Sequence, residues 1–285
     1  RVLLVSPFPP PFGGIASYSE NLYNGLLARN IRVKKYNTSR FDQYRFHNPD
    51  KKRNYIRIIH PQNLLFLSLI IFDYIIFIFS IILKRNLIVH VHTSSFFGWW
   101  RSTMFILIAR IIGKKTILHV HNAIDRFYFK ESGRLGKYLI RISLKIPHHL
   151  ISLSHGIKNL LEELTNNPIT PIYNGVEVKQ FQLEKDYTKP YKMLFAGFVG
   201  PHKGVPDLIS ALRKSKLSTT EIQLTVMGSG DIEEMKELSN KLVLNNQIIF
   251  TGRVSEEEKT KLFNTHHIFA LPSHGEGQLV PEPDG

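Results

Sequence analysis

The sequence of 285 residues contains no cysteine. This excludes a disulfide framework and any zinc site built on cysteine, and it fits a reducing compartment. Acidic residues are scarce in the first part of the chain: residues 1–175 hold 8 against 24 lysines and arginines, a net charge of +16, whereas residues 176–285 hold 15 against 13, a net charge of −2. This asymmetry predicts an anionic partner for the first part, and nucleic acid, anionic lipid and phosphorylated substrates all qualify. Simple solubility is the alternative explanation.

Other common signals are missing as well. The chain begins inside a strand pattern at Val2–Ser6, with no initiator methionine or signal peptide, and it ends without a closing helix. We therefore expect that both ends are cut. The pair Gly13 and Gly14 follows the first strand pattern, but it does not form the G-x-G-x-x-G fingerprint of dinucleotide-binding folds.

Short apolar runs alternate with amphipathic helical runs along the whole chain. The expected strands cover residues 2–6, 31–38, 87–91, 116–120, 150–153, 193–196, 222–227, 247–250 and 268–271, and residues 168–173 lead into Asn174 and Gly175. This alternation predicts an α/β fold with parallel sheets that are covered on both faces. The polar segment 176–192 is the expected linker between a domain of residues 1–175 and a second domain of residues 193–285.

Residues 64–83 are almost entirely apolar and long enough to cross a membrane. Two observations favour instead a helix that is buried or touches a membrane. The strands before and after it should pair in one sheet, and Asp73 in mid-segment adds about 2.5–3.5 kcal/mol against insertion. A membrane span remains the alternative. Basic residues on both sides suit a helix at an anionic surface, namely Lys51, Lys52, Arg53, Arg57, Lys84 and Arg85.

Residues 193–212 combine a strand pattern, a glycine loop and an amphipathic helix that is expected to begin at Lys203. Backbone N–H groups at a helix N-terminus attract anions, and a lysine adds a mobile positive charge. This arrangement predicts a phosphate site, with an ordinary surface lysine as the alternative.

Glycine or polar residues follow several other expected strands, at Gly13-Gly14, His121-Asn122, Gly228–Gly230 and Gly275–Gly277. Ligands of open parallel sheets bind at the carboxyl ends of the strands. If two such sheets face each other, these loops line one cleft that contains Lys203, several histidines and Glu276. Such a cleft suits a ligand with phosphates and hydroxyls.

Two His-x-His pairs, His90/His92 and His119/His121, lie in strand patterns that put both members of a pair on one face. A metal site is conceivable there. We favour packing within the sheet, because Asp125 is the only carboxylate nearby in sequence. His121 is the last residue of its strand, and we place it alone of the four in the cleft.

Seven motifs now stand in a fixed order along nearly the whole chain. They are the Gly13-Gly14-Ile15 loop, the strand ending in His121, Asn174–Val176, the glycine-lysine loop of Gly197–Gly204, Val226–Gly230, Phe250–Val254 and Leu271–Gly277. This order resembles the retaining family-4 glycosyltransferases of the GT-B fold.

The resemblance implies two facing Rossmann-like domains with a nucleotide-sugar donor between them, the second domain being incomplete here. It assigns Gly13, Gly14, Lys203 and Gly204 to the donor diphosphate, Gly228, Gly230, Arg253 and Val254 to the base and ribose, and His121 and Glu276 to the donor sugar as catalytic residues. Family members are usually drawn without a protein nucleophile, the leaving phosphate assisting the incoming hydroxyl. A UDP- or GDP-type donor is implied, with no metal and no other cofactor.

Two positions depart from the family pattern. Phe198 stands where the family commonly has an arginine beside the diphosphate, and Asp284 stands where it has a second glutamate.

From the resemblance we predict a glycosyltransferase that serves cell-surface polysaccharide synthesis, such as capsule or lipopolysaccharide. It would use a lipid-linked, oligosaccharide or polysaccharide acceptor, act in the cytoplasm on the inner face of the plasma membrane, and bind no nucleic acid. A truncated, non-catalytic nucleotide-sugar binder and a zinc hydrolase built on the histidine pairs are the alternatives.

Overall fold

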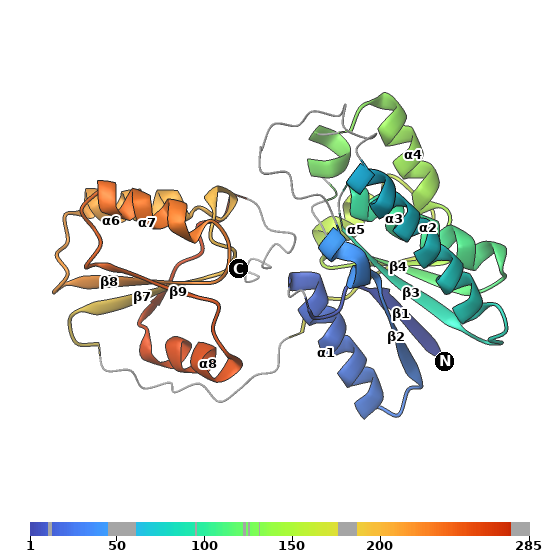
Figure 1. Ribbon diagram of the computed structural model, residues 1–285, viewed down its shortest axis with the longest axis horizontal. Helices are drawn as coiled ribbons and strands as arrows, with labels where there is room; N and C mark the ends of the chain where they lie inside the picture. Colours follow the sequence, from blue (N-terminus) through green and yellow to red (C-terminus); the bar gives the residue numbers. More distant parts are fainter. Residues whose placement is uncertain are drawn as a thin grey trace. The chain divides into compact units, whose positions relative to one another are not determined.

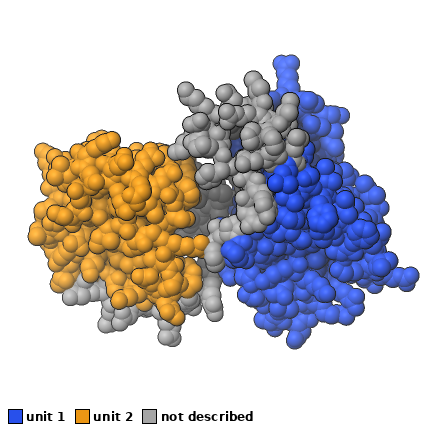
Figure 2. Space-filling model, viewed as in Figure 1, with its two compact units in different colours: residues 1–175, 277–285 blue, residues 176–276 orange. Residues whose placement is uncertain are grey.

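The computed structural model describes residues 1–10, 13–44, 61–94, 96–121, 124, 126–130, 132–175 and 187–274. The chain divides into two compact units (Figure 2): unit 1 is built from residues 1–175 and unit 2 from residues 176–276. Each contains one parallel sheet flanked by helices (Figure 1), six strands in unit 1 and four in unit 2. The predicted α/β fold with two parallel sheets is therefore confirmed.

Unit 1 has the strand order β2-β1-β3-β4-β5-β6. Its strands are β1 (Val2–Ser6), β2 (Val33–Asn37), β3 (Ile88–Thr93), β4 (Lys115–Val120), β5 (His149–Ser152) and β6 (Ile169–Pro171). Its helices are α1 (Gly14–Ala28), α2 (Pro61–Ile81), α3 (Phe97–Ile111), α4 (Arg134–Leu144) and α5 (His155–Glu162). A 3₁₀ turn at Thr38–Tyr44 and a π turn at Arg126–Lys130 complete the described elements.

The two faces of this sheet differ in polarity. On one face, Val91 and Leu118 belong to a large apolar core that includes Trp99 and Phe105 of α3. On the other face, α1 packs over Leu4 of β1 through its own apolar side chains. Leu4 is in register with His90, so the histidines of β3 lie on the α1 face. The sheet thus has one apolar face and one face that carries a cluster of histidines.

Helix α2 buries only one of its faces, although its sequence is nearly all apolar. Phe66, Ile70, Phe77 and Ile81 are buried at helical spacing. Asp73 lies on the same stripe and is 0 % exposed. Among the helices that the structure describes, none is long and apolar enough to cross a membrane. The buried stripe of α2 agrees with the prediction of a packed helix.

The buried carboxylate of Asp73 has specific partners in other elements. The hydroxyl of Tyr36 donates to Oδ1 at 2.8 Å, and Nη2 of Arg101 lies 3.0 Å from Oδ2. The Arg40 side chain also approaches, with Nε 3.6 Å from Oδ1. Burial, followed by the charge of Asp73, raises the pKa of Tyr36 far above its usual range, so its hydroxyl keeps the proton that it donates. Asp73 therefore ties α2 to β2 and α3.

Unit 2 has the strand order β10-β7-β8-β9. Its strands are β7 (Tyr191–Ala196), β8 (Ile222–Met227), β9 (Ile248–Gly252) and β10 (Ile268–Phe269), and its helices are α6 (Val205–Ser215), α7 (Ile232–Lys241) and α8 (Glu256–Thr265). Ser255 caps α8, its Oγ accepting from the Glu258 N–H at 3.1 Å. Strand β7 begins two residues earlier than predicted, inside the expected linker.

The predicted start of helix α6 at Lys203 was wrong. Lys203 does not open α6 but ends a separate 3₁₀ turn, Pro201–Lys203. Gly204 follows in a left-handed conformation with φ +71°, and α6 begins only at Val205. The left-handed residue interrupts the helical path, so Lys203 is carried by a tight turn in front of the helix.

Candidate functional site

The loops that follow β7 and β8 are joined by backbone hydrogen bonds. The N–H of Gly197 donates to the Met227 carbonyl at 3.0 Å, and the N–H of Val199 donates to the Ser229 carbonyl at 2.9 Å. The N–H of Asp231 returns to the Val199 carbonyl at 2.7 Å. These two loops therefore extend the sheet beyond its strands and form one backbone surface at its carboxyl edge.

Gly228 is required by this close approach. Its φ is +142°, and a Cβ atom there would lie 1.7 Å from the carbonyl oxygen of Gly197. No side chain fits such a position without displacing the neighbouring loop. The N–H of Gly228 also donates to the Gly252 carbonyl at 2.9 Å, which brings Arg253 and Val254 to the same edge.

Gly204 marks a second close approach, between the turn after β7 and the segment after β10. A Cβ atom on Gly204 would lie 1.9 Å from the Pro272 carbonyl oxygen. The N–H of His274 donates to the His202 carbonyl at 3.1 Å, and His274 Nε2 lies 2.8 Å from Oδ2 of Asp207. The half-buried Lys203 thus lies between His202 and Gly204, where the turn after β7 meets the segment after β10.

These contacts gather most of the predicted donor residues of unit 2 on one sheet edge. Lys203, Gly204, Gly228, Gly230, Arg253 and Val254 all lie in the loops after β7, β8 and β9. Phe198, at the position that departs from the family, is 46 % exposed and its ring stands 5.1 Å from that of His202. Glu276 and Asp284 lie outside the described residues, so their roles stay predictions.

In unit 1 the first turn of α1 presents bare backbone at its N-terminus. Gly13 is the N-cap residue and provides no side-chain hydrogen bond to the helix. Both Gly13 and Gly14 are exposed, and a Cβ atom on either would meet nothing within 4 Å in the described part of the chain. This open space allows a ligand to approach the N–H groups of the first turn, where the helix dipole favours an anion.

The four histidines of the two His-x-His pairs form one cluster on the α1 face. His92 of β3 is in register with His119 of β4, and their ring centroids are 5.0 Å apart. The ring of His121 lies 4.1 Å from His119 and 4.9 Å from His92, and His90 lies 4.7 Å from His92. Parallel register and alternation thus place all four side chains together, and the role of His121 at the donor sugar stays a prediction.

Two residues of α1 that the sequence analysis did not single out complete this cluster. The ring of Tyr18 stands edge-on to His121 at 4.7 Å and to His119 at 5.3 Å. Ser19 Oγ lies 3.2 Å from Nδ1 of His92. The sequence shows only that these two residues are neighbours in an expected helix. Their contact with the histidines could not be inferred before it was known which face of the sheet this helix covers.

Burial controls the charge of the cluster. It lowers the pKa of His90 to about 4 and the pKa of His121 to about 3, the latter with a contribution from the neighbouring His90. Burial and the other rings also lower the pKa of His92 and His119 well below the usual value. All four imidazoles are neutral at pH 7, so each can accept one hydrogen bond, or bind one metal ion, through an unprotonated nitrogen.

Comparisons with known proteins agree with this geometry. Residues 12–180 match the family model described as Glycosyltransferase Family 4, and residues 177–278 match the model described as Glycosyl transferases group 1. An uncharacterized glycosyltransferase of Methanocaldococcus jannaschii, MJ1178, is 27 % identical over 97 % of this chain and 73 % of its own length.

Two solved structures share the fold at low sequence identity. WaaG, a glycosyltransferase involved in lipopolysaccharide biosynthesis, aligns with a TM-score of 0.64 and 12 % identity, over 97 % of this chain and 76 % of its own. Anabaena HepE in complex with UDP aligns with a TM-score of 0.57 and 12 % identity, over all of this chain and 76 % of its own.

Proposed function

The chain belongs to glycosyltransferase family 4, and we propose that it moves a sugar, with retention, from a nucleotide-sugar donor to a lipid-linked or polysaccharide acceptor. One observation carries the proposal: the loop after β7, which includes Lys203, meets both the loop after β8 and the segment after β10 at the carboxyl edge of the unit 2 sheet. This is where a parallel sheet binds its ligand. The residue range 1–175 is the acceptor-side domain and 193–285 the donor domain in this proposal.

Each unit offers a group that suits a phosphate of the donor. Lys203 supplies a positive charge on a short turn, and the uncapped N–H groups that follow Gly13 and Gly14 supply hydrogen-bond donors. Charge-assisted hydrogen bonds to phosphate are about twice as strong as neutral ones. Arg253 and Val254, with Gly228 and Gly230, take the base and ribose. UDP, the nucleotide in the similar Anabaena structure, is the first donor type to test.

Catalysis then depends on positioning and charge stabilisation. The bond from the anomeric carbon to the phosphate oxygen breaks while the acceptor oxygen bonds to the same carbon. The proton of the acceptor hydroxyl passes to the leaving phosphate. His121, neutral through burial, accepts a hydrogen bond from the donor sugar near this carbon, and Glu276 binds sugar hydroxyls.

A membrane surface is the proposed place of action. Helix α2 exposes an apolar stripe that includes Ile71, Ile75 and Phe79, and Leu83 follows the helix at 90 % exposure. Lys84 and Arg85 come next, within a unit of net charge +16. An exposed apolar stripe bordered by basic residues suits a helix lying at an anionic lipid surface, where a lipid-linked acceptor is available.

A non-catalytic nucleotide-sugar binder is the second candidate, and Phe198 favours it. Its exposed ring stands where the family has an arginine, so one phosphate contact that stabilises the leaving group is replaced by an apolar side chain. Such a protein would bind the donor without transferring its sugar.

Transfer by the full-length protein separates the two candidates. The assay supplies UDP-sugars and a lipid-linked acceptor and measures the rate of transfer, the affinity for UDP and the melting temperature. His121→Ala should lower the transfer rate on the order of 100-fold or more, as expected for one lost transition-state hydrogen bond, with UDP affinity nearly unchanged. The control His149→Ala removes a β5 histidine that bonds Thr170 outside the cluster, and it should keep the rate. A His121→Ala protein with normal turnover would exclude the catalytic role.

A further inference from the structure

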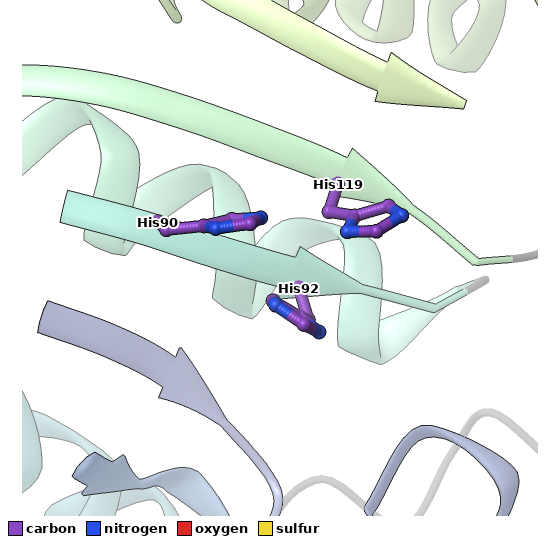
Figure 3. A group of neighbouring side chains, drawn as sticks. All are labelled: His90, His92 and His119. Atoms are coloured by element: carbon purple, nitrogen blue, oxygen red, sulfur yellow. The ribbon is translucent and has the colours of Figure 1, made fainter. Parts of the chain in front are cut away.

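Three buried histidines of unit 1 lie close together, and none of them belongs to the proposed donor site. His90 and His92 lie on β3 and His119 on β4, with His92 and His119 beside the carboxyl ends of their strands (Figure 3). Each offers one nitrogen atom, and these three nitrogens lie within 4.8 Å of one another. All three side chains are buried, at 8, 3 and 1 % exposure in that order.

Four ring nitrogens of these three histidines lack a partner among the described residues. Nε2 of His90, Nε2 of His92 and both nitrogens of His119 are buried without a hydrogen bond from any described residue. Buried polar atoms in native proteins are almost always satisfied by protein, water or an ion. Four such atoms in one cluster therefore indicate that something else occupies the space between the rings.

The hydrogen bonds of Ser19 determine which nitrogen of His92 carries the proton. Ser19 Oγ has three polar neighbours: the Ile15 carbonyl oxygen at 2.7 Å, Ser6 Oγ at 2.5 Å and Nδ1 of His92 at 3.2 Å. Ser19 donates its one proton to the Ile15 carbonyl, so its Oγ accepts from the Ser6 hydroxyl and from Nδ1–H of His92. Nε2 of His92 is consequently unprotonated, with its lone pair directed away from Ser19. A hydrogen bond that orients one ring nitrogen in this way typically accompanies metal-binding histidines.

We propose that His90, His92 and His119 bind one divalent transition-metal ion of the Zn²⁺ class. Three imidazole ligands suit zinc, cobalt, nickel or copper and do not suit magnesium or calcium, which require oxygen ligands. Ligand nitrogens of a tetrahedral zinc ion are about 3.3 Å apart, so the rings need to move inward by roughly 1 Å. The fourth position is left for water. Because its ligands come from two adjacent strands, the ion joins β3 to β4.

The charge state of the rings is compatible with this assignment. Metal ions bind the neutral imidazole, and burial lowers the pKa of His90 to about 4 and that of His119 further. At pH 7 no proton has to be displaced from these nitrogens. Internal water molecules are the competing occupants, and they require no metal.

Metal content and affinity test the proposal without any donor or acceptor, so the outcome is independent of the proposed function. The whole chain, prepared without a polyhistidine tag, is stripped with a chelator and titrated with Zn²⁺ and with Co²⁺. We expect about one ion per chain by elemental analysis, a tetrahedral Co²⁺ absorption spectrum, and a melting temperature that rises with Zn²⁺.

Two variants locate the ion. His119→Phe keeps an aromatic ring in the cluster but removes both nitrogens, and it should bind Zn²⁺ at least 100-fold more weakly while remaining folded by circular dichroism. The control His149→Ala removes a histidine from the next strand and should bind like the parent chain. A parent chain without a stoichiometric ion at micromolar Zn²⁺, or a His119→Phe chain of unchanged affinity, would overturn the assignment. If His119→Phe does not fold, His92→Gln replaces it with the same two criteria.

Discussion

The burial of Asp73 makes a quantitative prediction about unit 1. In Asp73→Ala the Arg101 guanidinium, 8 % exposed, loses the carboxylate that lies 3.0 Å away, and the Tyr36 hydroxyl loses one acceptor. Removing one partner of a buried ion pair costs about 3–5 kcal/mol, because the other charge remains buried without compensation. We expect a loss of this size in the free energy of unfolding of unit 1.

Tryptophan fluorescence can follow this unit selectively. The chain has two tryptophans, Trp99 and Trp100, and both are in α3 next to Arg101. Urea unfolding monitored at these residues reports unit 1 and not unit 2. At a slope of about 2–3 kcal/mol per molar urea, the midpoint of Asp73→Ala should fall by roughly 1–2 M.

A surface ion pair provides the control. Lys35 Nζ lies 2.6 Å from Oε1 of Glu20, but both side chains are about one-third exposed, so Glu20→Ala should cost less than about 1 kcal/mol. In Asp73→Leu with Arg101→Met, neither charge remains, and the double variant should lose less stability than the two single changes added together. Equal midpoints for Asp73→Ala and Glu20→Ala would refute the argument that Asp73 holds α2 on the unit.

Three further predictions concern the proposed sites. Lys203→Ala should weaken binding of UDP about 10-fold or more and leave uridine binding nearly unchanged, because a charge-assisted hydrogen bond contributes about 1.5–3 kcal/mol. If calorimetry shows equal losses of affinity for UDP and uridine, Lys203 does not bind the phosphates. Gly228→Ala should destabilise unit 2 by about 3 kcal/mol or more, measured by hydrogen exchange in β7 and β8, whereas Gly197→Ala, whose Cβ would lie 3.4 Å from a side-chain atom, should be tolerated. The chain should float with anionic vesicles, less so at high salt, and Phe79→Asp should reduce this binding; equal binding to neutral vesicles would contradict the charge argument.

Local pattern was sufficient to predict the elements and their order. Strand and helix periodicity extends over a few residues, so the alternation of strands with helices, apart from the short strand β6, could be recognised before any contact was known. The cap of α8 at Ser255 also depends only on residues close in sequence. The ordered motifs also indicated the family, which residues 12–180 match.

Contacts between distant segments required the tertiary structure. The sequence showed Asp73 inside an apolar run, but only the packing of α2 against β2 and α3 supplies its partners Tyr36 and Arg101, 37 and 28 residues away. Gly204 interrupts the helix after Lys203 because it adopts a left-handed conformation against Pro272, which is a contact and not a pattern. The histidine cluster likewise depends on the register of β3 with β4 and on α1 covering that face. Periodicity determines which side of a strand a residue occupies, whereas only the register between strands decides which residue lies beside it.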